Sequence, residues 1–353
     1  MKLTNPQLID MLERTEAAID PEIERRKRHE WRRALNREPF EPYFDIEATY
    51  GDPLEPGETP EVAINDAQDN LEPMLLDQIV AVYKTACRRT RHALNIRTNY
   101  GTGIMPSIFG AEMFVMERDT NTLPTAWPMG PDKVKSLLDR GMPELDTGLG
   151  GKVFECGEFY REVLEDYPTL KAWVNVYHPD LQGPIDVCEL LWGSEMFLAL
   201  VDMPDVVKQS LDLVTETYAA VLRRWFDLFP PVDDLSAHWG LMLKGQVLLR
   251  NDSLVNLSPA MYEEFVKPWD ERILEEFGGG AIHYCGRATH CVPGMCDSPN
   301  LTGLQVSQPH LNDLDVLFDH TLDGNVVLLS NLDPEMVDGR DLSSGFIGAV
   351  RAK

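Results

Sequence analysis

One stretch of the sequence combines a short apolar run, which predicts a strand, with two metal-binding side chain types: Gly278-Gly279-Gly280-Ala281-Ile282-His283-Tyr284-Cys285-Gly286-Arg287. Side chains two positions apart on a strand point to the same side, so we expect His283 and Cys285 to face one point. An imidazole and a thiolate together suit zinc. The alternative interpretation is a packed polar pair, because an isolated His-x-Cys is common without a metal.

Other short apolar runs, bounded by Gly, Asp, Asn or Pro, occur along the chain at 93–97, 172–177, 235–239, 246–250, 303–306 and 326–329. Most of these runs alternate with amphipathic segments of helical period, which indicates parallel βαβ units. Roughly eight strands over about 260 residues favour an α/β fold of the (β/α)8 TIM barrel type over an open doubly wound sheet. No Gly-rich nucleotide fingerprint marks a strand-to-helix turn, which also disfavours the open sheet.

The chain before this alternation has a different composition. Residues 6–36 show a polar helical pattern with a dense basic block at 24–33, and residues 39–60 are rich in Pro and acidic residues. We therefore predict an N-terminal helical and extended segment at 1–72, packed on a barrel at 73–353. The basic block predicts a solvated helix face, and the alternative is a basic wall for an anionic part of a substrate.

Composition limits the classes of partner. The 353 residues contain 32 Lys and Arg against 58 Asp and Glu, a formal net charge of −26. This charge disfavours nucleic acid and anionic membrane surfaces. The apolar runs are too short to span a bilayer, the start of the chain has no signal-peptide pattern, and the six cysteines lack framework spacing. We therefore predict a cytoplasmic enzyme that acts on a small molecule.

In a barrel of this kind, chemistry takes place where strands end and loops begin. Among the polar residues at such points we predict Asp252 and His238 as catalytic; the structural alternatives are an N-cap and a core histidine, respectively. The predicted substrate-binding residues follow expected strands or lie in the loops after them; they are Tyr100, Tyr177, Trp239, Arg287, Gln305 and Gln308.

The segment 283–309 resembles the uroporphyrinogen decarboxylase superfamily. Gly183-Pro184, Asn256-Leu257-Ser258-Pro259 and Ser330-Asn331-Leu332-Asp333-Pro334 are similar to further motifs of that superfamily, in the same order. The resemblance runs from about residue 75 almost to the end of the sequence and implies a (β/α)8 barrel. The superfamily contains decarboxylases of porphyrinogen carboxylates and zinc-containing, corrinoid-linked methyltransferases.

Two motifs separate these branches. The decarboxylases carry an N-terminal signature close to Trp-x-Met-Arg-Gln-Ala-Gly-Arg, which this sequence lacks, so it has no obvious arginine clamp for a polycarboxylate. The His-x-Cys pair resembles the zinc motif of the methyltransferase branch, which implies His283 and Cys285 as ligands. That branch takes its third ligand from a cysteine beyond the Asn-x-Asp turn, but no cysteine follows Cys296 here. Cys291, Cys296 or a strand-end carboxylate are the candidates for the third ligand.

The resemblance therefore implies a zinc-dependent methyltransferase that moves a methyl group between a small substrate and a corrinoid, with the corrinoid bound at the barrel mouth or on a partner protein. One alternative is a decarboxylase of a tetrapyrrole or other carboxylate, with Asp252, Tyr100 or His238 as the acid and no metal. Another is a non-catalytic barrel that binds a corrinoid or tetrapyrrole. A homodimer formed through exposed apolar helices is a further prediction.

Overall fold

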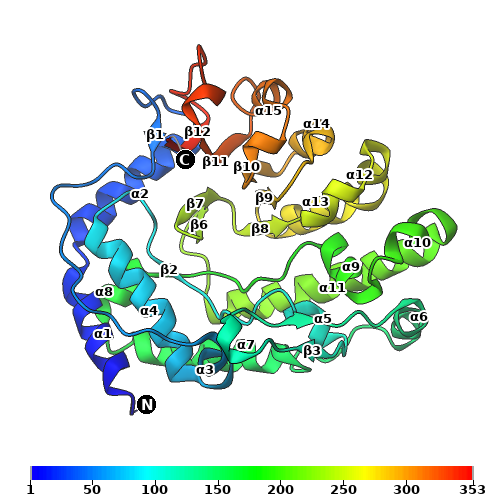
Figure 1. Ribbon diagram of the computed structural model, residues 1–353, viewed down its shortest axis with the longest axis horizontal. Coiled ribbons are helices and arrows are strands. Elements are labelled where there is room, and N and C mark those ends of the chain that lie inside the picture. Colours follow the sequence, from blue (N-terminus) through cyan, green and yellow to red (C-terminus); the bar gives the residue numbers. More distant parts are fainter. Residues whose placement is uncertain (1, 352–353) are drawn as a thin grey trace.

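A computed structural model describes residues 2–351, so the outer limits of both predicted regions lie outside the described residues (Figure 1). The fold is mixed α/β. Its largest sheet has six strands in the order β1-β12-β11-β10-β9-β8, and every neighbouring pair is parallel. These strands are β1 (Phe44–Asp45), β8 (Val247–Arg250), β9 (Gly280–Tyr284), β10 (Leu301–Val306), β11 (Val327–Leu332) and β12 (Phe346–Val350).

Helices lie around the strands, mostly on the outside of the ring in Figure 1. The helices are α1 (Pro6–Ala18), α2 (Pro21–Leu35), α3 (Ile64–Asp69), α4 (Leu71–Arg88), α5 (Ile104–Ile108), α6 (Pro131–Arg140), α7 (Leu149–Leu164), α8 (Pro168–Trp173), α9 (Pro184–Trp192), α10 (Met196–Asp202), α11 (Pro204–Leu228), α12 (Pro259–Phe265), α13 (Lys267–Glu276), α14 (Val292–Cys296) and α15 (Leu314–His320). Within residues 2–351, none of these helices is both long and apolar enough to span a membrane.

The ring of strands is not closed by continuous hydrogen-bonded ladders. β2 (Asn95–Ile96) and β5 (Asn175–Val176) form a separate parallel pair, and β3 (Met113–Phe114) pairs antiparallel with β4 (Thr125–Ala126). Segments that flank these strands contact the large sheet or its borders: the amide of Arg91, before β2, donates to the carbonyl of Ile46 (3.1 Å), and the amide of Gly183, at the start of α9, donates to the carbonyl of Arg250 (2.7 Å). The parallel α/β prediction is therefore confirmed, whereas a closed barrel is not detected within residues 2–351, because the β2–β5 pair shares no ladder with the large sheet.

The N-terminal region contributes directly to this architecture. The helical pattern at 6–36 corresponds to two helices, since the chain turns at Asp20, whose side chain accepts from the amide of Glu22 (2.9 Å) and caps α2. β1 pairs with β12 and is thus an edge strand of the large sheet. The predicted boundary between residues 72 and 73 falls inside α4.

The basic block is neutralised by acidic side chains of the same chain. Lys27 is buried and pairs with Glu24 at 2.7 Å, while Arg28 and Arg32 pair with Asp233 at 2.6 and 2.7 Å. The prediction of a solvated face is wrong for Lys27, and these pairs leave no basic wall of free cations. The pairs of Arg28 and Arg32 with Asp233 tie α2 to the segment before β6.

Residues 235–239, predicted as a barrel strand, belong instead to an antiparallel hairpin of β6 (Leu235–His238) and β7 (Leu241–Lys244). Its turn consists of Trp239 (φ 52°) and Gly240 (φ 79°). Both residues have the positive φ that a two-residue hairpin turn of this kind needs at its central positions. The hairpin lies near the centre of the ring in Figure 1. The βαβ interpretation fails here because a strand of alternating apolar residues looks the same in a hairpin and in a parallel sheet.

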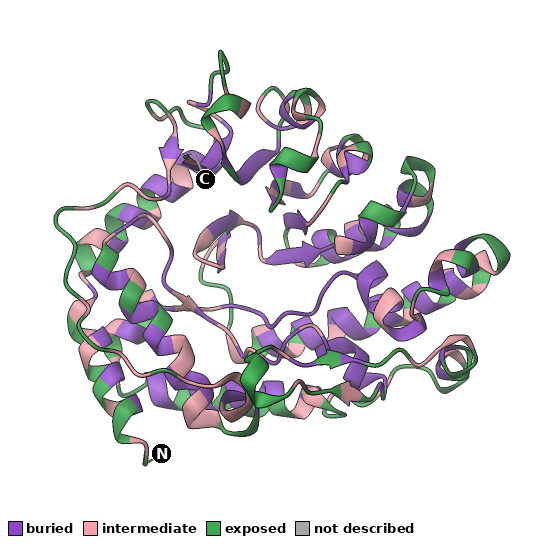
Figure 2. Ribbon diagram, viewed as in Figure 1, coloured by how far each residue is buried: buried purple, intermediate pink, exposed green. Residues whose placement is uncertain are grey.

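The two faces of the large sheet have different neighbours. One face packs against the surrounding helices and includes Val247, Leu249 and Ile282. The other, inner face forms a second apolar cluster with α2 and the hairpin, which contains Trp31, Leu235, Ala237, Met242, Leu243, Leu248, Ala281, Val327, Leu329 and Ile347. Most of the large sheet and much of the hairpin are buried (Figure 2). The hairpin therefore fills the inside of the ring, as side chains do in a barrel.

A candidate metal centre at the strand ends

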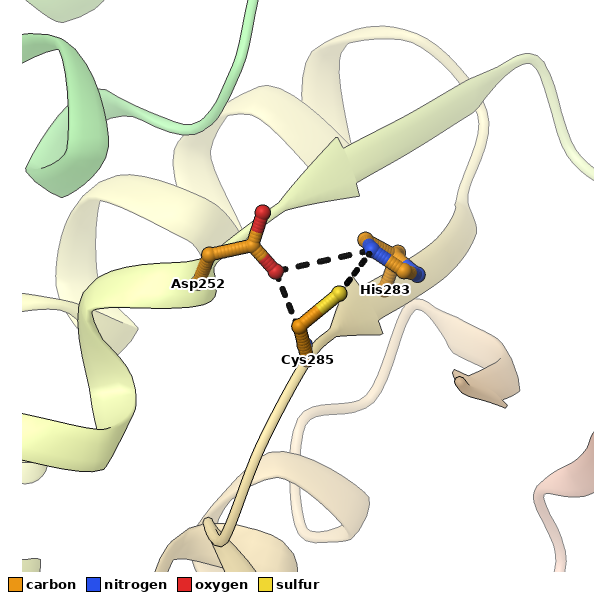
Figure 3. A group of neighbouring side chains, drawn as sticks. All are labelled: Asp252, His283 and Cys285. Carbon is orange, nitrogen blue, oxygen red and sulfur yellow. Dashed lines mark hydrogen bonds and ion pairs between the residues drawn. The ribbon is translucent and has the colours of Figure 1, made fainter. Parts of the chain in front are cut away.

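Three potential metal ligands meet at the carboxyl ends of β8 and β9 (Figure 3). His283 lies on the inner face of β9, two residues after the inward Ala281, and Cys285 directly follows the strand. Asp252 begins the 3-10 helix Asp252–Asn256 just after β8. Nε2 of His283 is 3.4 Å from Sγ of Cys285 and 3.5 Å from Oδ1 of Asp252. The structure thus brings the predicted His-x-Cys pair together and adds a strand-end carboxylate.

These separations fit a tetrahedral zinc ion. Zinc binds nitrogen and oxygen at about 2.0–2.2 Å and sulfur at about 2.3 Å, so ligand atoms on adjacent tetrahedral corners lie about 3.3–3.7 Å apart. The two measured separations fall in this range, and all three ligand atoms lie within 4.8 Å of one another. Three protein ligands leave one position open, as in catalytic zinc sites. Because the Asp252 side chain is 44% exposed, solvent reaches the group.

The neighbouring strand β10 fixes the tautomer of His283. Gln305 is the register partner of His283, and its Oε1 accepts a hydrogen bond from the Nδ1–H of the imidazole. Nε2 is then the unprotonated nitrogen, and it faces Cys285 and Asp252. Burial lowers the pKa of His283, which also favours the neutral ring. Gln305, a predicted substrate-binding residue, is therefore placed where it orients a ligand.

The loop after β9 holds Cys285 in position. The backbone amide of Cys285 donates to Asp252 Oδ1 (2.8 Å), and the amide of Gly286 donates to Oε1 of Gln308 (2.7 Å). Gly286 has a φ of 77°, a conformation that favours glycine at this turn. Burial and the negative charge of Asp252 raise the pKa of the Cys285 thiol to about 11. The thiol is therefore protonated at neutral pH unless a cation stabilises the thiolate.

The start of α9 supports Asp252 from the other side, a contact that the sequence analysis missed. The carboxylate of Asp186 accepts from the amides of Asp252 (2.7 Å) and Ser253 (3.0 Å). Burial raises the pKa of Asp186 to about 7. A Cβ on Gly183 would lie 1.9 Å from Oδ1 of Asn251, so only glycine allows α9 to begin this close to the strand end. In the sequence, the Gly183-Pro184 motif is the feature that marks this close approach of α9 to the end of β8.

The tip of the β6–β7 hairpin lies next to the three candidate ligands. The ring of Trp239 meets that of His283 edge-on at 5.0 Å, and the guanidinium of Arg250 lies 4.6 Å from the centre of the indole. Arg250 is 1% exposed and pairs with Asp180 (3.2 Å), which also pairs with Arg97 (3.1 Å). Trp239 was predicted as a substrate contact, whereas this buried charge network was not expected.

Several predicted residues lie outside the group. Cys291 is not one of the three; it is buried, and burial raises the pKa of its thiol to about 12. Tyr100 is buried, and burial together with the neighbouring Cys156 raises the pKa of its hydroxyl. Arg287 is exposed in the loop after β9. Tyr177 and His238 line a cavity that none of the three candidate ligands lines. The carboxylate alternative for the third ligand is therefore the one that fits the geometry.

Comparisons with known proteins bear on the fold. No protein-family model matches the chain, and a search of curated proteins gives no match. Among solved structures, the fold is similar to that of a methyltransferase from Methanosarcina mazei, with a TM-score of 0.62 and 16% sequence identity over 90% of this chain and 91% of that chain. At this identity the similarity shows a shared fold.

Proposed function

We propose that the protein is a zinc-dependent methyltransferase of the uroporphyrinogen decarboxylase superfamily, which moves a methyl group between a small substrate and a corrinoid. The observation that carries this proposal is the group of His283, Cys285 and Asp252, in which His283 Nε2 lies at tetrahedral separations from the other two ligand atoms and one position is left open. The shared fold with a protein described as a methyltransferase supports it. The proposal includes the (β/α)8 barrel as the underlying architecture.

In this mechanism, His283 Nε2, the Cys285 thiolate and the Asp252 carboxylate would hold the zinc. The thiolate and the carboxylate together carry two negative charges, which offset the two positive charges of a divalent cation. A bound zinc ion supplies Lewis acidity and lowers the pKa of a thiol in the open position. Gln305 keeps the proton of His283 on Nδ1, so that Nε2 offers its lone pair, and Cys285 loses its proton when the ion binds.

The open position suits a small thiol substrate, because a thiolate is a strong zinc ligand. The proposal also includes a corrinoid, bound at the same ends of the strands or on a partner protein. The ring of Trp239 and the half-exposed Asp252 would border the reacting group, since both contact His283.

Metal analysis of the purified protein tests the proposal first. We expect about one zinc per chain in the unchanged protein and almost none after Cys285→Ser. Cys296→Ser is the matched control, since Cys296 is a partly buried cysteine outside the group. Absence of stoichiometric zinc in the unchanged protein would contradict the proposed centre and favour the metal-free alternatives, a decarboxylase or a non-catalytic binding barrel.

Methyl transfer is tested next with methylcobalamin and a small thiol, by the change in corrinoid absorbance. We expect turnover in the unchanged protein and in Cys296→Ser, but not in Cys285→Ser. Stoichiometric zinc without turnover on any thiol tried would leave the metal centre standing and overturn the methyltransferase assignment.

A further inference from the structure

A second cavity lies between β5, β6 and the carboxyl end of α11, and none of the three candidate metal ligands lines it. Its volume is about 530 Å³. Much of its wall is apolar and aromatic, including Trp173, Val174, Phe226, Phe229 and Met242. Small-molecule sites commonly have volumes of roughly 300–1,000 Å³ and walls of this composition. The cavity thus has the size and lining of a ligand site.

Three buried polar atoms of this cavity wall have no hydrogen-bond partner within residues 2–351. His238 is 1% exposed, and both of its ring nitrogens lack a hydrogen-bond partner, as does Oγ of Ser236 on the same strand. Both residues line the cavity. Buried polar groups in folded proteins are nearly always paired. Three unpaired atoms in one wall therefore indicate an occupant that hydrogen-bonds there.

The neighbouring histidine differs from His238 in its hydrogen bonds. The rings of His178 and His238 meet edge-on at 4.5 Å. Nδ1 of His178 donates to the carbonyl of Pro179 (2.8 Å), and its Nε2 accepts from the amide of Leu248 (3.3 Å), so both nitrogens are satisfied. Of these two neighbouring histidines, only the one on the hairpin lacks a hydrogen-bond partner within residues 2–351.

The protonation state of His238 limits the chemistry of the occupant. Burial, with the nearby His178 and Arg250, holds the pKa of His238 well below its usual value, so the ring is neutral. A neutral imidazole offers one N–H donor and one acceptor nitrogen, and Ser236 offers a hydroxyl that does both. A hydroxyl group complements this set. Of the cations that line the cavity, Arg28 and Lys171 pair with Asp233 and Glu165, respectively, and Arg161 is exposed.

We infer that this cavity is a second binding site, for a neutral aromatic compound that carries a hydroxyl group. Its ring system lies among the apolar walls, and its hydroxyl pairs with His238 and Ser236. The site goes beyond the proposed methyl transfer and does not depend on it. It gives His238 and Tyr177, predicted as residues of the strand-end site, a different role in ligand recognition.

Equilibrium dialysis with 2-naphthol and with naphthalene, which has the same rings without the hydroxyl, tests this inference. We expect one 2-naphthol per chain and about tenfold weaker binding of naphthalene, since a hydrogen bond is worth up to about tenfold in affinity. His238→Phe should reduce 2-naphthol affinity to that of naphthalene and leave naphthalene nearly unchanged. Ser236→Ala, a smaller change, should weaken 2-naphthol alone by about threefold.

A variant that narrows the cavity gives an independent check. Ala172→Phe places a ring at an exposed position that lines the cavity, so it should weaken both probes. Glu162→Phe, at an exposed position of α7 outside the cavity lining, should weaken neither. Both variants should keep the zinc content of the unchanged protein.

The inference is overturned if neither probe binds, since the cavity then holds only solvent. It is also overturned if the two probes bind equally, or if His238→Phe and Ser236→Ala weaken both probes alike. Binding that survives Ala172→Phe unchanged would place the probes elsewhere and would likewise overturn it.

Discussion

The beginnings and the ends of the central strands differ in chemistry, although they belong to the same inner face. On β9, Ala281 packs under the hairpin in the apolar cluster, whereas His283, two residues later, faces Asp252 and Cys285. On β8, Leu248 belongs to the same cluster, and Arg250 lies against Trp239. Packing residues and candidate ligands thus occupy neighbouring positions of one strand, so their effects should be separable by substitution.

The largest expected effect is at the ligand end. His283→Ala removes the imidazole whose Nε2 faces both other ligands, so we expect the loss of stoichiometric zinc measured by elemental analysis. His29→Ala, at an exposed position of α2, is the matched control and should keep its zinc. Full zinc content in His283→Ala would show that the metal binds elsewhere.

A substitution in the inner apolar cluster should lower the stability of the protein and leave its zinc content unchanged. Trp31 is fully buried in the inner cluster, and its Nε1 donates to the carbonyl of Arg91 (2.6 Å). Trp31→Ala should lower the free energy of unfolding by about 3–5 kcal/mol in urea titrations and leave the zinc stoichiometry of the folded protein unchanged.

Trp127→Ala is the control for this prediction, because Trp127 is 55% exposed. We expect it to change the free energy of unfolding by about 0.5 kcal/mol or less. Equal destabilisation by the two variants would contradict the role given to the inner cluster, and loss of zinc from folded Trp31→Ala would show that the two ends are coupled.

A smaller effect is expected for the residue that orients the ligand. Gln305→Leu removes the acceptor of the Nδ1–H of His283, which should weaken zinc affinity about 10–100-fold in competition with a chelator and keep the stoichiometry at saturating zinc. Gln308→Leu, which changes a glutamine bound to the Gly286 amide, should cost less. Equal losses in both variants would argue against a specific role for Gln305.

The dependence of zinc affinity on pH should be the most gradual effect. The pKa of Cys285 is about 11 without a metal, so zinc binding at lower pH displaces one proton, and affinity should rise about tenfold per pH unit between pH 7 and 9. His283, whose pKa is lowered, is already neutral there and adds no slope. A flat profile in the unchanged protein, or the same slope in Cys285→Ser, would exclude the Cys285 thiolate as a ligand.

The local pattern of the sequence was enough to predict a parallel α/β fold and the shared direction of two candidate ligands. Alternating apolar runs and amphipathic segments predicted a parallel α/β fold, and the period of a strand predicted that His283 and Cys285 face one point. These inferences succeed because side-chain direction along a strand depends only on neighbouring residues.

Only the tertiary structure decided which distant segments meet. It placed Asp252 rather than Cys291 beside His283, because adjacent parallel strands end at the same edge. It also turned residues 235–239 into a hairpin inside the ring and left His238 in a separate cavity. Such outcomes depend on packing between segments far apart in the chain. A local sequence pattern carries no information about that packing.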